Sequence, residues 1–325
     1  MTGAALSLYD PVADRDWDTL VESSCNGTFL HTRRFLAYHG SRFVDRSMLL
    51  HDGRGHLVGV IATAEDPHDP TTVVSHPGIS YGGIVHDGSL RGERLIEVLD
   101  LVVRQLSDMG YRRFRYKTIP WIYHRHLACD DSYALFRLQG RRSRCELTTT
   151  VDLGHPGKPS HGRRTGLQLA SRAGVHVYFG WEHIAEFWQV LEASLAERYG
   201  AVPTHSLAEI NHIHDLFPQE TGLLAARVGT DMVAGALLFT TTTVLHTQYI
   251  ASTEKGRAAS ALDPIINQAV DIARERGCRF FDFGTSNTDQ GRGLNQSLYE
   301  FKLSFGAGGA VHEEFEVSLP SHTWP

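Results

Sequence analysis

The stretch Cys278–Gly306, CRFFDFGTSNTDQGRGLNQSLYEFKLSFG, contains the clearest structural signals of the chain. Its apolar run Phe280–Phe283 predicts a buried strand that ends at the following glycine. A polar loop rich in Gly, Asn, Thr and Ser comes next. Within Asn295–Phe305, apolar residues then recur at intervals of three and four, at Leu298, Phe301 and Phe305. That spacing marks one face of a short helix, so the stretch predicts a strand, a loop and a helix.

Lys302 stands next to Phe301 on this predicted helix. A lysine beside an aromatic residue, downstream of a strand and its loop, is well placed to put a fixed positive charge beside a site. The alternative is a surface lysine on an amphipathic helix. The residues alone leave both interpretations open.

The rest of the chain repeats this pattern, because its two halves share one order of elements. The first half predicts a helix over Arg91–Asp108 and then a strand over Tyr111–Tyr116. The second half predicts a helix over Ala259–Arg276 and then the strand of the opening stretch. A predicted hairpin precedes each helix, over residues 48–61 and 223–239. Each half therefore predicts a mostly antiparallel mixed sheet flanked by helices, an α/β (α+β) arrangement.

A Gly/Pro-rich segment at Gly154–Pro159 separates the two halves and is typical of a linker. We therefore expect two domains, residues 1–155 and 156–325. Directly after the linker we expect a basic segment at Arg163–Arg172, a strand at Val175–Phe179 and an amphipathic helix at Ile184–Tyr199.

Length and composition limit which classes of protein the chain can belong to. The 325 residues suffice for two domains, and 42% hydrophobic with 21% charged residues is typical of a soluble globular protein. No apolar run reaches the length of a membrane span, and the N-terminus does not predict a signal peptide. Four scattered cysteines without a CxxC pair favour a cytoplasmic location. A net charge of -6 argues against a broadly basic nucleic-acid-binding surface but allows a local basic patch.

The duplicated order resembles the acetyltransferase-like (GNAT) fold, and two copies in one chain resemble the FemABX family. The most specific marks are FDFG at 281–284, Asn295–Leu298, and the phenylalanine–lysine pair with Phe305–Gly306. The segment Tyr116–His124 is also similar to bacterial FemAB-like proteins. The resemblance covers essentially the whole chain. No long charged helical hairpin interrupts the second half, so the chain resembles a short form without the coiled-coil arm.

The resemblance implies an aminoacyltransferase that forms an amide between an amino acid from aminoacyl-tRNA and an amine. The acceptor would be a small peptide or a cell-wall or antibiotic precursor, and no cofactor would be needed. Within the family the lysine of the Phe-Lys pair serves the active site, so Lys302 is the expected catalytic residue, with Phe301 beside the substrate. The charge would hold the developing oxyanion or the 3′ end of the tRNA.

Further candidates follow from position in the repeat, since loops at corresponding ends of related units often face a shared cleft. Asp282 alternates with two phenylalanines and is a candidate to accept an amine proton, or to cap a neighbouring backbone. The substrate-binding candidates are polar or aromatic residues at strand ends and helix starts: Tyr81, Lys117, Tyr123, His124, Tyr249, Thr285, Ser286 and Asn295. For the tyrosines, core packing is an equal alternative.

Two basic clusters are candidates for binding tRNA phosphates. One comprises Arg141, Arg142 and Arg144, and the other comprises Arg163, Arg164 and Arg172. A solvated charged face is the alternative. Histidine pairs such as His124 with His126 lack HExxH or Cys-His spacing, so we expect no metal site.

Two other classes of function remain open. The loop Thr253–Ala258 stands where a GNAT enzyme holds the pyrophosphate of coenzyme A, although only Gly256 and Ala258 fit that pattern. A coenzyme A-dependent N-acyltransferase is therefore the first alternative. A non-catalytic binding protein that has kept the fold is the second.

Overall fold

The computed structural model describes residues 3–320, which divide into two compact units. Unit 1 comprises Met1–Glu146, Asp289–Gly293 and Val311–Pro325, and unit 2 comprises Leu147–Thr288 and Leu294–Ala310. The C-terminal part of the chain thus returns to unit 1 after completing unit 2. The division into domains at residues 155 and 156 stays a prediction.

Unit 1 is built on two groups of strands. The first is an antiparallel sheet with the order β1-β2-β3-β6, formed by Ala5–Leu8, Met48–His51, Leu57–Ile61 and Ile84–His86. The second has the order β4-β5-β7-β16-β8, formed by Ala64–Asp66, Asp69–Val74, Arg113–Lys117, Gly308–Ser318 and Arg141–Asp152. In it β5 and β7 are parallel, whereas β7 and β16 are antiparallel. The long strands β8 and β16 each carry residues of both units.

The helices of unit 1 are α1, α2, α3 and α4, over Asp14–Ser23, Arg33–Leu36, Glu93–Asp108 and Asp130–Arg137. Helix α3 is the largest contributor to the core, because its apolar stripe falls at helical spacing and packs on the strands. It ends before Gly110, whose φ of +91° permits the left-handed turn that stops the helix. The predicted helix and the strand that follows it are confirmed.

Unit 2 has one mixed sheet with the order β8-β13-β12-β11-β10-β9. Besides β8, its strands are Phe280–Thr285 (β13), Val244–Ser252 (β12), Asp231–Thr240 (β11), Thr221–Val228 (β10) and Val175–Phe179 (β9). Every neighbouring pair is antiparallel except β12 with β13. The short strands β14 and β15, Asn287–Thr288 and Gly293–Leu294, follow β13. The mostly antiparallel mixed sheet of the prediction is confirmed.

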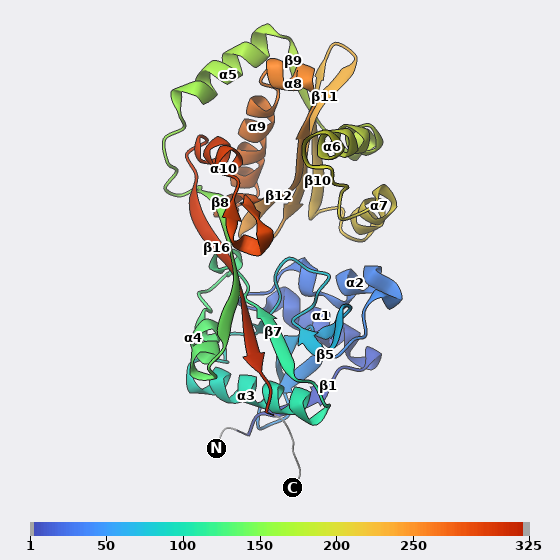
Figure 1. Cartoon of the computed structure of the whole chain (residues 1–325), viewed down its shortest axis with the longest axis vertical. Coiled ribbons are helices and arrows are strands. Elements are labelled where there is room, and N and C mark those ends of the chain that lie inside the picture. Colours follow the sequence, from blue (N-terminus) through green and yellow to red (C-terminus); the bar gives the residue numbers. More distant parts are fainter. Residues whose placement is uncertain (1–2, 321–325) are drawn as a thin grey trace. The chain divides into compact units, whose positions relative to one another are not determined.

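Helices cover both faces of the unit 2 sheet, with α9 and α6 on opposite sides (Figure 1). The helices α5, α6, α7, α8, α9 and α10 span His161–Arg172, Ile184–Tyr199, Leu207–Leu216, Glu254–Ala258, Leu262–Glu275 and Gln296–Leu303. Alternate strand residues such as Leu245, Phe281 and Phe283 face α9 and form the core on that side. The predicted helix over 259–276 is shorter at its start, because Ser260 adopts a φ of +51° between α8 and α9.

Candidate functional site

The two parallel strands of unit 2 separate before they end. β12 and β13 pair over three residues, Val244–His246 with Phe280–Asp282. Beyond that point β12 continues to Ser252, while Thr285 of β13 pairs with Thr148 of β8. A register shift in β12 near Gln248 accompanies the separation. The edge of β12 that faces β13 is therefore left open over its second half.

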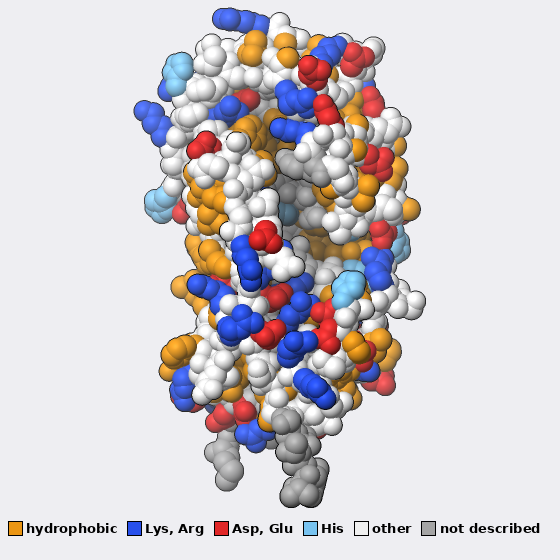
Figure 2. Space-filling model, viewed as in Figure 1, with side chains coloured by type: hydrophobic (Ala, Val, Ile, Leu, Met, Phe, Trp, Pro, Cys, Tyr) orange, Lys and Arg blue, Asp and Glu red, His pale blue; other side chains and the backbone are white. Residues whose placement is uncertain are grey.

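A cavity of about 670 Å³ lies at this opening. Its lining comes from α6, the open edge of β12, helix α8, the start of α9, the end of β13 and helix α10, together with Arg163 of α5. Figure 2 shows the hollow between α6 and α10, with Lys and Arg side chains beside it. Arg198 and Arg257 are among the lining residues. The volume lies in the range of sites for small molecules.

Lys302 reaches this cavity from α10 and is almost fully buried, with 5% of its surface exposed. Its Nζ donates to the carbonyl oxygens of Gly284 at 2.9 Å and Thr285 at 2.8 Å. Burial lowers the pKa of Lys302 to about 8, although the nearby Asp282 carboxylate favours the charged form. The ammonium group has three N–H donors, and no described residue accepts the third. A positive charge with a spare donor thus stands in the wall of the cavity.

Asp282 is on β13, close to Lys302, and has no exposed surface. One carboxylate oxygen accepts from the hydroxyl groups of Thr148 at 2.6 Å and Thr150 at 2.7 Å, both on β8. The other accepts from Nδ1 of His246 at 2.8 Å and from the amide of Gly284 at 3.2 Å. These bonds give both oxygens of the buried carboxylate hydrogen-bond donors, and they fix its orientation.

His246 is the partner of Asp282, and the sequence analysis did not single it out. It is the third residue of β12, Asp282 is the third of β13, and the parallel register places the two side by side. Aligning the two strands from their first residues would have found this pair. The side chain of His246 is 20% exposed, so one edge of the ring faces the buried carboxylate and the other faces solvent.

Four of the predicted substrate-binding residues line the same cavity, namely Tyr249, Thr285, Asn295 and Phe301. The hydroxyl of Tyr249 lies 2.8 Å from Nδ1 of His205, and its ring meets Trp188 edge to face. Asn295 is also the N-cap of α10, since its side chain accepts from the amide of Leu298. Ser286 is buried beside them, and its hydroxyl has no partner among the described residues.

The loop at Thr253 begins α8 at another wall of the cavity. The hydroxyl of Thr253 accepts from the amide of Gly256, and its carbonyl accepts from the amide of Arg257. Gly256 is packed so closely that a Cβ atom there would lie 2.1 Å from the carbonyl oxygen of Val233. Close packing therefore accounts for glycine at position 256, and the amides of Gly256 and Arg257 already have partners within the turn.

Arg163, predicted to bind tRNA, makes close contacts inside unit 2. Its guanidinium lies 3.3 Å from the carboxylate of Asp263, which is 4% exposed. The same group stands over the rings of Phe301 at 5.2 Å and Phe305 at 5.0 Å. The other two arginines of the cluster, at 164 and 172, are exposed on α5.

The second arginine cluster lies in unit 1 on β8, where each member pairs with a glutamate. Arg141 bonds Glu316 at 3.0 Å and Arg142 bonds Glu313 at 2.8 Å, both across to β16. Arg144 pairs with Glu146 at 2.6 Å. Figure 2 shows blue and red side chains mixed over this region. The surface is thus mixed in charge rather than uniformly basic.

The remaining candidates lie in unit 1 and are buried or partly buried. Nζ of Lys117 donates to the carbonyls of His76 and Ile79, and burial lowers its pKa to about 8. Tyr81 and Tyr123 pack ring against ring, with centroids 4.4 Å apart. The structure thus gathers Lys302, Asp282 and the cavity residues in unit 2, and these candidates in unit 1.

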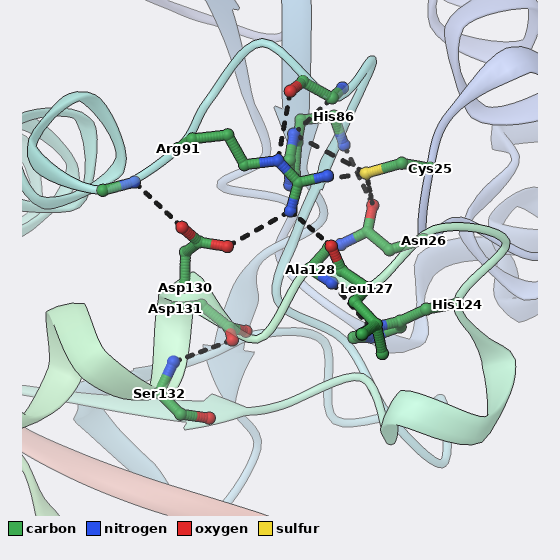
Figure 3. A network of polar contacts seen from close by, with 12 residues as sticks. Cys25, Asn26, His86, Arg91, His124, Leu127, Ala128, Asp130, Asp131 and Ser132 are labelled. Atoms are coloured by element: carbon green, nitrogen blue, oxygen red, sulfur yellow. Dashed lines mark hydrogen bonds and ion pairs between the residues drawn. The ribbon is translucent and has the colours of Figure 1, made fainter.

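His124 belongs to a polar network that holds the loop before α4 (Figure 3). Its ring bonds the carbonyl of Ile119 at 3.0 Å and the amide of Ala128 at 3.2 Å. Burial lowers the pKa of His124 to about 4, so the ring is neutral. In the same network Arg91 bridges the Leu127 carbonyl and Asp130. These contacts give His124 a structural task in this loop.

Within residues 3–320, no three His, Cys, Asp or Glu side chains come together as metal ligands would. None of the helices in this range has the length and apolar character needed to cross a bilayer.

Comparison with known proteins agrees with this geometry. Residues 163–302 match the family described as acetyltransferase (GNAT) domain. This part of the chain is therefore similar to a GNAT domain. The match ends at Lys302 and includes the separated strands, the α8 loop and the cavity. A search of curated proteins gives no match.

Solved structures extend the likeness to the whole chain. The structure of FemX is similar with a TM-score of 0.69, 15% identity and 97% of each chain covered. L-PGS from Bacillus licheniformis follows with a TM-score of 0.59 and 12% identity, covering 94% of this chain and 91% of that one. A tandem GNAT protein from the clavulanic acid biosynthesis pathway has a TM-score of 0.54 and 10% identity, with coverages of 98% and 99%. The expected tandem GNAT-like fold is confirmed, and it is similar to the fold of FemX.

Proposed function

We propose that this protein is an aminoacyltransferase that moves an amino acid from aminoacyl-tRNA to the amine of a small peptide or peptide-like precursor. The observation that carries the proposal is the buried Lys302 ammonium, with its third N–H unused by described residues, in the wall of the cavity. Attack of an amine on an ester puts negative charge on the carbonyl oxygen. A preorganised donor in a site shielded from water stabilises that charge most effectively.

The chemistry asks the protein to align the two reactants and to hold the oxyanion, with no covalent intermediate. The two carbonyls that Lys302 binds fix the position of its charge, because they belong to the end of β13. Phe301 and Tyr249 add aromatic surface on the cavity wall, which suits an amino acid side chain or a nucleobase.

The hydrogen bonds within the α8 loop favour tRNA over coenzyme A as the donor. A pyrophosphate needs several free amides at a helix start. Here the amides of Gly256 and Arg257 bond Thr253, and the amide of Ala261 bonds the Gly256 carbonyl. The FemABX resemblance, which implies aminoacyl-tRNA, supports the same choice.

An acyl-coenzyme A-dependent N-acyltransferase is the second candidate. Ser252, Gly256 and Arg257 line the cavity, so a nucleotide phosphate bound near α8 would meet a positive charge. Both candidate functions use the same opening between β12 and β13. They differ in the donor that binds there, which is aminoacyl-tRNA in the first and acyl-coenzyme A in the second.

A direct assay separates the candidates. The full chain is incubated with unfractionated tRNA charged with radiolabelled amino acids and with a pool of dipeptide amides as acceptors. We expect label in a product that survives mild base, since amides outlast esters, and we expect ribonuclease to abolish it. Transfer from acetyl-coenzyme A after ribonuclease treatment would instead establish the second candidate. Product from neither donor would favour a binding protein.

A further inference from the structure

We propose that His246 is the general base of this site and that Asp282 is the residue that positions it. The inference rests on the proposed function and assigns the proton transfer that amide formation requires. It is carried by the geometry of three neighbouring groups: the His246 ring, the buried carboxylate behind it, and the Lys302 ammonium.

The hydrogen bonds fix the tautomer of His246. Because the Asp282 carboxylate can only accept, Nδ1 of the ring must carry the hydrogen that bridges the 2.8 Å contact. In the neutral ring Nε2 is then an acceptor. No described residue bonds Nε2, and that atom is not buried. A neutral imidazole with an open acceptor nitrogen is the arrangement that a general base needs.

Hydrogen bonds to both oxygens fix the Asp282 carboxylate, so the carboxylate can fix the orientation of the His246 ring. Asp282 is fully buried, and two threonine hydroxyls from β8 and the Gly284 amide share its oxygens with His246. Protonation of the ring would place a positive charge 2.8 Å from this carboxylate, which stabilises the imidazolium that proton transfer creates. Asp282 has no exposed surface that could touch a substrate, so its role is to position His246.

The base stands close to the proposed oxyanion donor. A Cβ atom at position 284 would lie 3.1 Å from Cε1 and 3.9 Å from Nε2 of His246. The carbonyl oxygen of that same Gly284 binds Lys302 at 2.9 Å. His246 and Lys302 therefore both lie against Gly284. Lys302 lines the cavity, as do Thr247, which follows His246 on β12, and Thr285, which follows Gly284 on β13; His246 itself is not among the lining residues.

The proton balance follows from this arrangement. The amine enters neutral, and its lone pair forms the C–N bond to the ester carbonyl carbon, while Lys302 holds the oxyanion. The positively charged nitrogen of the intermediate then gives one proton to Nε2 of His246. As the C–O bond to the ribose breaks, the imidazolium returns this proton to the leaving oxygen. His246 ends neutral, and no further reactant is needed.

The charged group in contact with the ring is Asp282 on β13, and Lys302 on α10 lies against the same Gly284 as the ring. The β8 neighbours of the carboxylate are threonines, and the β11 residue paired with His246 is Phe239, so neither strand adds charge. The transfer rate should fall as pH rises and Lys302 loses its proton.

The test compares His246→Asn with wild type in single-turnover transfer from charged tRNA to glycinamide. Asn retains a donor toward Asp282 and lacks the nitrogen that would accept the proton. We expect a loss of about a hundredfold, within the range for general bases. We also expect added imidazole to restore part of the rate. The exposed His176→Asn serves as the matched control and should behave as wild type.

The outcomes separate the two claims. If wild type gives no transfer from any charged tRNA, the proposed function fails and the base assignment falls with it. If wild type transfers and folded His246→Asn keeps the rate, the base assignment alone is overturned. A rate loss that added imidazole does not restore would mean a structural role and would also overturn the assignment. Nitrogen NMR of the ring adds a check independent of substrate: hydrogen on Nε2 instead of Nδ1 would contradict the assignment.

Discussion

The ammonium group of Lys302 donates to the carbonyl oxygen of Gly284 at 2.9 Å, across eighteen residues of sequence. Gly284 has a φ of +75°, a left-handed conformation that turns the chain as β13 ends. Lys302 therefore fixes the end of this strand while it presents a charge to the cavity. Lys302 thus has a structural role in addition to the proposed catalytic role.

Lys302→Met should lower the transfer rate by at least about a hundredfold, as loss of one oxyanion donor does. It should also lower stability by roughly 1–3 kcal/mol, because two inward-facing carbonyls lose their donor. Single-turnover rates and melting temperatures measured side by side check both effects. Lys255→Met is the matched control, since Lys255 is exposed and paired with exposed Asp231. Near-normal turnover in folded Lys302→Met would remove the assignment.

The charge of Lys302 should give both rate and stability a pH dependence. Its pKa is lowered from 10.5 to about 8 by burial, so the transfer rate should fall as pH rises through about 8. Stability should move the other way. Between pH 8 and 10.5 the unfolded chain binds more protons at this lysine, so its contribution to stability rises with pH. Denaturant unfolding of wild type and Lys302→Met from pH 7.5 to 10 tests the sign, and a difference that shrinks with rising pH would contradict it.

Asp282→Asn should destabilise unit 2 by about 2–3 kcal/mol or more. The amide cannot accept all the bonds from two threonines, His246 and Gly284, and one of its NH₂ hydrogens would face a donor. Urea unfolding measures the loss. Asp271→Asn on the exposed face of α9 is the control and should change stability by less than about 0.5 kcal/mol. An equal effect of both variants would argue against a buried network.

Arg163 and Arg164 should respond differently to replacement by alanine, although they are neighbours in sequence. Arg163→Ala leaves the Asp263 carboxylate buried without its partner and should cost about 3 kcal/mol of stability. Arg164→Ala should leave stability unchanged. If the side chain contacts tRNA, the replacement should also reduce the slope of the logarithm of the binding constant against the logarithm of the salt concentration by about the amount that one phosphate contact contributes. Thermal unfolding and tRNA titrations at several salt concentrations measure the two effects. A large stability loss in Arg164→Ala would reverse these roles.

The elements of the fold could be expected from the sequence because their signals are local. The strand at Phe280, the helix that carries Lys302 and the strand Val175–Phe179 follow from apolar spacing within a few residues. The glycines at 110 and 277 mark helix ends because left-handed turns favour glycine. Lys302 could be singled out from its motif, and it lies in the cavity wall.

Tertiary structure decided what those residues do. Arg163 and Lys302 are both basic residues in amphipathic helices, and the sequence gives no sign that one meets Asp263 and two aromatic rings while the other meets two carbonyls. His246 and Asp282 lie thirty-six positions apart, and only the parallel register of β12 and β13 makes them partners. Spacing along the chain records which residues share a face of one element, because helix and strand periods are local. Burial, ion pairing and proton affinity depend on groups that distant segments bring together, so they appear only when the chain is folded.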